Sequence, residues 1–155
     1  MPVEIQLATD TDTPDIAAIE SWSTGALAAV PSAPERRPAM EGELCVRVVD
    51  DDESRSLNAT YRGVDKPTNV LSFPAGIHLP DALLWGDVVI CAPVVRREAV
   101  EQGKRYEDHF AHMVVHGVLH LFGYDHQTAA QADVMERLEQ EILDRFGIGD
   151  PYGEG

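Results

Sequence analysis

Residues 109–126 read HFAHMVVHGVLHLFGYDH, and this stretch organises the fold that we expect for the rest of the chain. Its apolar residues recur with the helical period, and glycine is a residue type that often ends helices. The sequence therefore predicts a helix from about Tyr106 to Phe122 that ends at Gly123. Histidines occupy positions 109, 112, 116 and 120, and His126 follows the end of the helix. We expect a central helix that also carries a functional site.

Before this helix the predicted order is strand, helix, strand, helix, two strands and a further helix, and one amphipathic helix follows it. Strands are predicted at residues 3–9, 43–50, 69–73 and 83–92, and helices at residues 14–30, 53–62, 94–103, 106–122 and 128–146. This order predicts one α+β domain over residues 1–155, in which helices pack on a small mixed four-stranded sheet. The tail from about residue 147 is expected to be loosely ordered.

Three local features of these elements also lead to expectations. Thr13 is predicted to be the N-cap of the first helix. Gly86 suggests a β-bulge or a close approach of another segment within the fourth strand. Val134, Leu138 and Ile142 recur at helical spacing, so they are expected to form the buried face of the last helix.

The composition of the 155 residues is that of a globular protein, with 44% hydrophobic residues. No apolar run is long enough to span a membrane, and the first residues lack the features of a secretory signal, so we expect a soluble cytoplasmic protein. Cys45 and Cys91 each lie in a strand-like run and are predicted to be buried free thiols. They could form a disulfide only if their two strands were neighbours.

The formal net charge of −15 argues against binding of nucleic acids or membranes through bulk electrostatics. The charge is uneven, because residues 133–144 hold five acidic residues and one arginine, whereas basic residues lie upstream of the histidines. Those upstream residues include Arg62, Lys66, Arg96, Arg97, Lys104 and Arg105. The sequence permits a local basic face, but the last four are expected to be ordinary solvated surface.

The spacing of the histidines indicates which of them can share one metal ion. His116 and His120 are four residues apart on the predicted helix, where side chains are neighbours, so both imidazoles can reach one ion. His126 can complete the set after the helix has ended, whereas adding His112 would spread three ligands over roughly 12 Å of helix axis. We therefore predict a zinc site on the central helix and the following turn. His112 is expected to pack beside the site, and His109 is expected to lie on the surface.

Three nitrogen ligands without a cysteine suggest a catalytic rather than a structural zinc site, because structural sites are usually closed and rich in thiolates. Zinc is favoured over iron, although Asp125 beside His126 keeps iron open.

In zinc peptidases of the HExxH type, a glutamate follows the first histidine as the general base, but here Gly117 occupies that position. A peptidase would need Asp87 or Asp125 as its base. Gly117 would instead permit a strand or a substrate to lie close to the helix.

Two sequence blocks and a short strand resemble the YbeY family of endoribonucleases, also called rRNA maturation factors. The first block is HGVLHLFGYDH at residues 116–126, and the second is SLNATYRGVDKPTNVLSFP at residues 56–74. WGDVVIC at residues 85–91 resembles a further strand of that family. The chain departs from the pattern at Val64, where many members carry lysine, and this change removes a positive charge from the loop that would face RNA.

The resemblance implies a metallohydrolase-like α+β fold that binds one zinc ion per chain through His116, His120 and His126. It also implies a cytoplasmic enzyme that cuts single-stranded RNA in ribosomal RNA maturation, including the 3′ end of 16S rRNA, and in ribosome quality control. The small ribosomal subunit and assembly factors are the implied partners. His116 and Arg62 are the residues that the resemblance places in catalysis.

The chemistry of Arg62 agrees with this role, because a guanidinium can bind a phosphate through two hydrogen bonds and stabilise charge that develops on it. Lys66 would add a contact to the RNA backbone, or would simply be solvated. Two other functions stay open at this point. One is a zinc metallopeptidase-like hydrolase, and the other is a zinc-binding ribosome assembly factor without catalytic activity.

Overall fold

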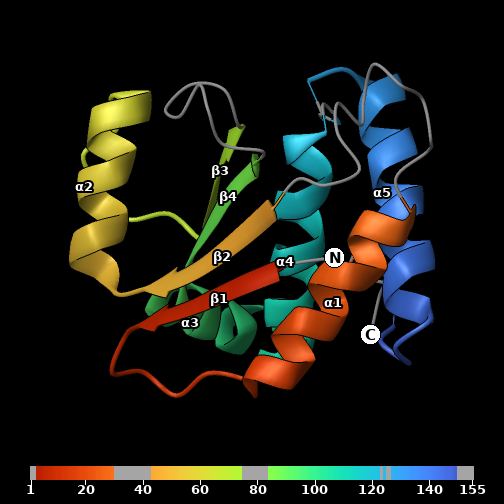
Figure 1. The fold of residues 1–155 in the computed structure, drawn as a ribbon, viewed down its shortest axis with the longest axis horizontal. Coiled ribbons are helices and arrows are strands. Elements are labelled where there is room, and N and C mark those ends of the chain that lie inside the picture. The colour runs from red at the N-terminus through yellow and green to blue at the C-terminus, as the bar shows by residue number, and fades with distance from the viewer. Residues whose placement is uncertain (1–2, 30–42, 75–83, 123, 125–126, 150–155) are drawn as a thin grey trace.

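The computed structural model of the chain describes residues 3–29, 43–74, 84–122, 124 and 127–149 (Figure 1). Strands and helices alternate up to β3, β4 follows β3 directly in the order of elements, and three helices come last. The elements are β1 (Val3–Ala8), α1 (Ile16–Ala29), β2 (Glu43–Val49), α2 (Asp51–Arg62), β3 (Val70–Pro74), β4 (Leu84–Cys91), α3 (Ala92–Gln102), α4 (Tyr106–Leu121) and α5 (Ala129–Asp144). Their order agrees with the predicted α+β class.

The four strands form one mixed sheet with the order β1-β2-β4-β3. β1, β2 and β4 are parallel, whereas β3 runs antiparallel to β4 at the edge of the sheet. Glu43 pairs with Leu84 and Leu44 pairs with Gly86, so β4 contains one extra residue at this point. Gly86 has a φ of 144°, a backbone conformation that favours glycine. The predicted bulge at Gly86 is therefore confirmed.

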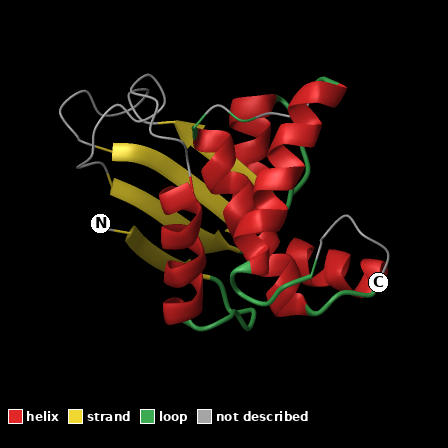
Figure 2. Cartoon of the chain, turned by 90° about the vertical axis from the view of Figure 1, so that its right-hand side faces the viewer, coloured by secondary structure: helices red, strands yellow, loops and turns green. Residues whose placement is uncertain are grey.

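Helices cover both faces of the sheet, but they do so unequally. On one face, α4 packs against β3 and β4 while α1 packs against β1, and α5 lies against the outer sides of α1 and α4 (Figures 1 and 2). On the other face, α2 covers a smaller apolar cluster that includes Leu57, Leu71 and Val89. α4 consequently lies between the sheet and α5, and most of its surface is buried.

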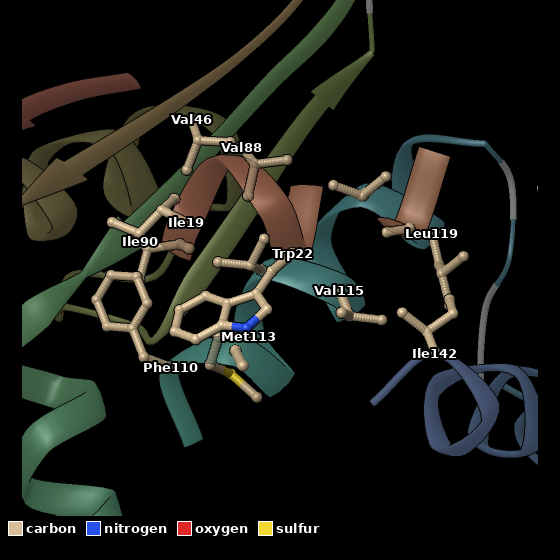
Figure 3. Packing of buried hydrophobic residues seen from close by; sticks show 14 of the residues in the cluster. Ile19, Trp22, Val46, Val88, Ile90, Phe110, Met113, Val115, Leu119 and Ile142 are labelled. Atoms are coloured by element: carbon tan, nitrogen blue, oxygen red, sulfur yellow. The ribbon is translucent and has the colours of Figure 1, made fainter. Parts of the chain in front are cut away.

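The main core forms around α4 because this helix carries large apolar side chains toward α1 and the sheet. Phe110 is fully buried, with its ring centroid 6.5 Å from that of Trp22 and 5.8 Å from that of Tyr106. Figure 3 shows Phe110 and Trp22 beside Met113, and Leu119 near Ile142 of α5. Burying each such side chain stabilises the fold by roughly 1.5–3 kcal/mol. α4 is thereby a rigid support for the side chains at its C-terminal end.

One prediction about a helix end is wrong, and one about a helix face is confirmed only in part. α1 begins at Ile16 rather than after Thr13. The first hydrogen bond of the helix runs from the Ile19 amide to the Asp15 carbonyl, so Asp15 directly precedes the helix. On α5, Ile142 is buried as predicted and Leu138 packs partly buried against the main core, but Val134 is 55% exposed. The buried residues of α5 are Met135, Glu139, Ile142 and Leu143.

The two cysteines are free, as expected. β2 and β4 are indeed neighbours, but Cys45 pairs with Asp87 and Cys91 pairs with Val49. The two thiols are therefore about four residues apart along the strands, a separation of roughly 13 Å, which a disulfide cannot span. Cys91 is buried, whereas Cys45 is only half-buried, which differs from the prediction for this residue.

None of the helices in the described ranges combines the length and the apolar character needed to cross a bilayer. The tail is described only as far as residue 149, so residues 150–155 of the predicted loose tail lie outside the described residues. Ile148, which precedes them, packs against the main core.

Candidate metal centre on the central helix

Four histidine rings follow one another along α4. The ring centroids are 6.1 Å apart for His109 and His112, 6.1 Å for His112 and His116, and 5.9 Å for His116 and His120. Their burial decreases toward the C-terminus, because His109 is 3% exposed, His112 is 5% exposed and the side chain of His116 is 19% exposed. His120 is exposed. Only the C-terminal pair therefore combines helical spacing with access from solvent.

His116 and His120 each use the Nδ1 atom in a hydrogen bond with an acceptor. The Nδ1 atom of His116 lies 2.8 Å from an oxygen of the Glu139 carboxylate, and Nδ1 of His120 lies 2.7 Å from the backbone oxygen of Tyr124. A carbonyl or carboxylate oxygen can only accept, so Nδ1 carries the hydrogen in both neutral rings. The lone pair is then on Nε2 in both rings, and this is the arrangement that metal-binding histidines commonly show.

The geometry of this pair fits one metal ion. Two imidazoles bound to the same ion at about 2.0–2.1 Å per nitrogen have ring centroids roughly 5 to 6 Å apart, and His116 and His120 meet this condition. The donors are both neutral nitrogens, which suit zinc and other transition metals. His126, the third predicted ligand, lies outside the described residues, as do Asp125 and Gly123.

A second set of potential ligands lies deeper in the molecule. His112, His116 and Glu139 place three donor atoms within 4.8 Å of one another, so this group could also bind a metal ion. The Nε2 atom of His112 is 3.3 Å from the same Glu139 oxygen that contacts His116. This arrangement agrees with the expectation that His112 packs beside the site.

Glu139 is fully buried, which is unusual for a carboxylate. Burial raises the pKa of its carboxyl, but hydrogen bonds from His112 and His116 outweigh this effect and hold the pKa at about 2. Burial lowers the pKa of His112, and the hydrogen bond to Glu139 opposes this shift. Glu139 is therefore an ionised acceptor that His112 and His116 share.

The prediction that His109 lies on the surface is wrong. Its ring is buried between α4 and α3, where Nε2 lies 2.9 Å from a carboxylate oxygen of Glu98. The amide of Asn69 also donates to Glu98, at 3.1 Å. The hydrogen bond from His109 lowers the pKa of Glu98, and burial opposes that shift. His109 is thus a structural residue that links α4 to α3 and to the start of β3.

Arg62 and Lys66 lie at the C-terminal end of α2 and in the loop that follows it. Arg62 is the last residue of the helix and is exposed, and Gly63 ends the helix with a φ of 71°. The loop folds back onto α2, because the amide of Asn58 donates to the Lys66 carbonyl at 2.8 Å. The hydroxyl of Ser54 donates to the Thr68 carbonyl and accepts from the Thr68 amide, both at 3.0 Å. These contacts fix the backbone that carries the two basic side chains.

β3 connects this basic loop to the histidine helix. Ser72 and Phe73 are consecutive in the strand, so their side chains point to opposite faces of the sheet. The Ser72 hydroxyl donates to the Gly117 carbonyl of α4 at 2.8 Å, and the Phe73 ring contacts Tyr61 of α2 at 4.8 Å between centroids. The C-terminal ends of α2 and α4 accordingly lie toward the same end of the molecule, at the top of Figure 1.

The other upstream basic residues lie on α3 and at the start of α4, away from this end, and three of the four are exposed as predicted. Arg96, Arg97 and Arg105 are exposed, while Lys104 is half-buried. Arg97 forms an ion pair with Asp51 at 3.4 Å, with both side chains about half exposed. Such exposed pairs contribute little to stability.

Gly117 has a packing role that explains the absence of a glutamate at its position. A Cβ atom there would lie 2.5 Å from Cγ1 of Val88 and 3.0 Å from Cγ2 of Val70. The expected close approach of a strand is therefore confirmed. Asp87 was one of the two acids considered as the general base of a peptidase. Its side chain lies on the opposite face of the sheet from α4, because the alternate residues Val88 and Ile90 belong to the core that α4 covers.

The sequence analysis missed the polar residues that support the site: Ser54, Asn58, Glu98 and Glu139. For Glu139 a signal was present, because it is four residues after Met135 and three before Ile142, on the apolar stripe of the helix. An acid at such a position is costly unless it has a partner. The face predicted for α5 consisted of Val134, Leu138 and Ile142 and therefore did not include Glu139.

Comparison with known proteins gives consistent matches across the chain. The sequence matches the family described as Endoribonuclease YbeY over residues 4–147. A curated protein of that name from Halorhodospira halophila is 61% identical over 117 residues, which cover 73% of this chain and 76% of the relative. Another, from Pseudomonas putida (strain W619), is 48% identical over 156 residues and covers 99% of this chain and 94% of the relative.

The fold also has a counterpart among solved structures. The solution structure of a Thermotoga maritima protein superposes with a TM-score of 0.58 and covers 98% of this chain and 99% of the other chain. The two sequences are 23% identical, so this likeness concerns the fold alone.

Proposed function

Because the chain belongs to the YbeY family of endoribonucleases, we propose that it is a zinc-dependent enzyme that cuts single-stranded RNA. Its proposed tasks are ribosomal RNA maturation, including the 3′ end of 16S rRNA, and ribosome quality control. The observation that carries the proposal is the pair His116 and His120, whose Nδ1 atoms are both held by acceptors at the accessible end of α4. The C-terminal end of α2, where Arg62 is exposed, lies toward the same end of the molecule, on the other face of the sheet.

One zinc ion per chain would be held by His116, His120 and His126. When bound by neutral imidazoles, zinc supplies a strong positive charge that acidifies a bound water and polarises a phosphate oxygen. The third ligand is proposed from the sequence motif, in which His126 follows the helix-ending Gly123. The buried His112 would remain outside the ligand set.

Arg62 would bind the phosphate that is cut. Its guanidinium can form two parallel hydrogen bonds with a phosphate and stabilise the negative charge that grows during the reaction. Lys66 would contact a neighbouring phosphate of the strand. The support for both roles is the braced backbone of residues 62–68, since Ser54 and Asn58 hold this loop against α2. A loop held in this way loses little conformational freedom when RNA binds.

The acidic charge of the whole chain bears on how RNA would reach the site. A net charge of −15 opposes non-specific binding to nucleic acids, so substrate choice would depend on docking to a larger partner. The small ribosomal subunit and its assembly factors, in the cytoplasm, are the proposed partners. Free RNA is then expected to be a poor substrate at every salt concentration, because added salt weakens the repulsion by the acidic body and the attraction to the basic side chains together.

Peptide hydrolysis is disfavoured by the packing of α4. A glutamate at position 117 would have to direct its Cβ into Val88 of β4, so the general base of an HExxH peptidase has no room there. Asp87 lies on the far face of the sheet, and Asp125 lies outside the described residues.

The direct experiment compares RNA cleavage by the wild type, Arg62→Ala and Arg105→Ala over a range of salt concentrations, with matched single-stranded and duplex RNA. Arg105 is an exposed arginine at the opposite end of α4, so its replacement gives the same change of charge away from the site. We expect the wild type and Arg105→Ala to cut only the single strand. Arg62→Ala should be slower by at least about 100-fold, as expected when a group that stabilises developing charge is removed.

Equal cutting by all three proteins would reject the role of Arg62. Absence of cutting by the zinc-loaded wild type, on free RNA and on small-subunit precursors, would reject the nuclease and favour the assembly-factor alternative. Cleavage of a peptide substrate in place of RNA would return the peptidase to consideration.

A further inference from the structure

Glu139 is the least expected side chain near the candidate metal centre. It is a fully buried carboxylate on α5, a helix whose other buried residues are apolar. Burying a charge is costly unless partners compensate for it, and here one carboxylate oxygen contacts both His116 and His112. The core around α5 would be simpler to pack with leucine at this position, so the carboxylate points to a role beyond packing.

We infer that Glu139 is a positioning residue for His116: it accepts the Nδ1 hydrogen, fixes the ring, and leaves Nε2 as the nitrogen that binds metal. This inference rests on the proposed function, because it assumes that His116 is a metal ligand. A carboxylate that accepts from the second nitrogen of a ligating imidazole sets its tautomer and increases its basicity. Both effects would strengthen binding of a positively charged ion.

His112 completes the arrangement from the buried side. Its Nε2 atom lies 3.3 Å from the same Glu139 oxygen, so that the carboxylate is held between two rings one helical turn apart. His112 therefore restrains Glu139, and Glu139 in turn restrains His116. This explains why a third histidine occurs at ligand-like spacing without reaching the accessible end of the helix.

α5 is well placed to deliver this carboxylate. Thr128 begins the helix with a capping box, in which its side chain accepts from the Gln131 amide and the Gln131 side chain accepts from the Thr128 amide. The helix then packs against α4, with Met135 and Ile142 buried on either side of Glu139 along the same face. The position of the carboxylate is therefore set by the same core that holds α4.

The 3.3 Å between His112 and Glu139 is compatible with either arrangement, but the distance between His116 and Glu139 favours a supporting carboxylate over a bound metal ion. Two ligands that share a tetrahedral zinc at about 2.0–2.1 Å are roughly 3.3 Å apart. The separation of 2.8 Å between His116 and Glu139 is shorter and is that of a charge-assisted hydrogen bond. This pair is in direct contact, with no room for an ion between the two atoms.

The test uses two measurements on the wild type, Glu139→Gln and Glu141→Gln. Glu141 is exposed on the same helix, so its replacement is the matched control for loss of one negative charge. The first measurement is the tautomer of each histidine ring at pH 8 in metal-free protein, by nitrogen NMR. His120 is an internal reference, because its Nδ1 hydrogen is held by a backbone oxygen that neither variant changes. The second measurement is zinc affinity by competition with a chelator.

We expect His116 to carry its hydrogen on Nδ1 in the wild type and in Glu141→Gln, and to show a mixture of tautomers in Glu139→Gln. Zinc affinity should fall by about 10- to 100-fold in Glu139→Gln alone. An Nε2–H tautomer of His116 in the wild type would overturn the inference even if the variant failed to fold. Unchanged zinc affinity in a folded Glu139→Gln would overturn it as well. A wild type that binds no zinc would instead overturn the proposed function, and the inference with it.

Discussion

The two halves of α4 each carry two histidines at nearly the same spacing, but the first pair is buried and the second pair is accessible to solvent. In the N-terminal half, His109 and His112 are buried and contact the acids Glu98 and Glu139. In the C-terminal half, His116 is partly exposed and His120 is exposed, and both hold their Nδ1 atoms against an acceptor. Spacing along a helix therefore does not by itself distinguish a structural histidine from a ligand.

The difference between the halves comes from the elements that pack on them. α3 closes over the beginning of α4 and brings Glu98 to His109, whereas the end of α4 leads into the loop before α5. In the first half, His109 and His112 each use Nε2 in a contact with an acid, and these contacts link α4 to α3 and to α5. An accessible imidazole can exchange water for a metal ion, and we propose that the second half does so.

The largest effect that would separate the halves is stabilisation by zinc. At free zinc about 1,000 times above the dissociation constant, binding to the folded state should add about 4 kcal/mol to the free energy of unfolding. This gain should persist in His109→Ala and disappear in His120→Ala. Urea unfolding with zinc and with a chelator measures it. Equal gains in both variants would remove the proposed distinction between the halves.

A smaller effect should appear in the stability of the metal-free protein. His109→Ala removes a buried ring and leaves the Glu98 carboxylate without its closest partner, so the free energy of unfolding should fall by about 2–4 kcal/mol. His120→Ala changes an exposed side chain and should cost less than about 1 kcal/mol. Chemical denaturation in the presence of a chelator measures both values. A reversed order would show that the accessible half, rather than the buried half, maintains the fold.

The smallest effect concerns the pH dependence of the link between His109 and Glu98. The pKa of Glu98 is lowered in the folded state, so its ionised form favours folding. This contribution is complete above the usual pKa of 4.5 and is lost as the pH falls through the lowered value. Glu98→Gln should therefore be less stable than the wild type by about 1–2 kcal/mol at pH 7. The difference should shrink below about pH 4.5.

Unfolding curves of the wild type and Glu98→Gln between pH 3 and pH 7 test this sign. Glu101→Gln on the same helix is the control, because Glu101 is exposed. A difference that grew toward acid pH would mean that protonated Glu98 is the form that stabilises the fold.

The course of the chain was largely predictable because periodicity and turn residues are local signals. The four strands, the bulge at Gly86 and the helix that carries the histidines all follow from patterns within a few residues. The start of α1 was misplaced because Thr13 has the chemistry of an N-cap, whereas the helix begins three residues later. Such local signals mark the neighbourhood of a helix end better than its exact residue.

The partners of the histidines could not be predicted in the same way, because they come from other elements. Glu98 is 11 residues before His109, and Glu139 is 23 residues after His116. Nothing local to α4 shows that α3 and α5 will bring these acids to its surface. The spacing of His116 and His120 was informative because it depends on the geometry of α4 alone.

The most direct test of the account is the zinc content of purified protein, measured by elemental analysis for the wild type, His120→Ala and His109→Ala. The wild type and His109→Ala should each contain about one zinc ion per chain, and His120→Ala should contain almost none. A folded His120→Ala variant that retains one zinc ion per chain would contradict the assignment of metal binding to the accessible half of α4.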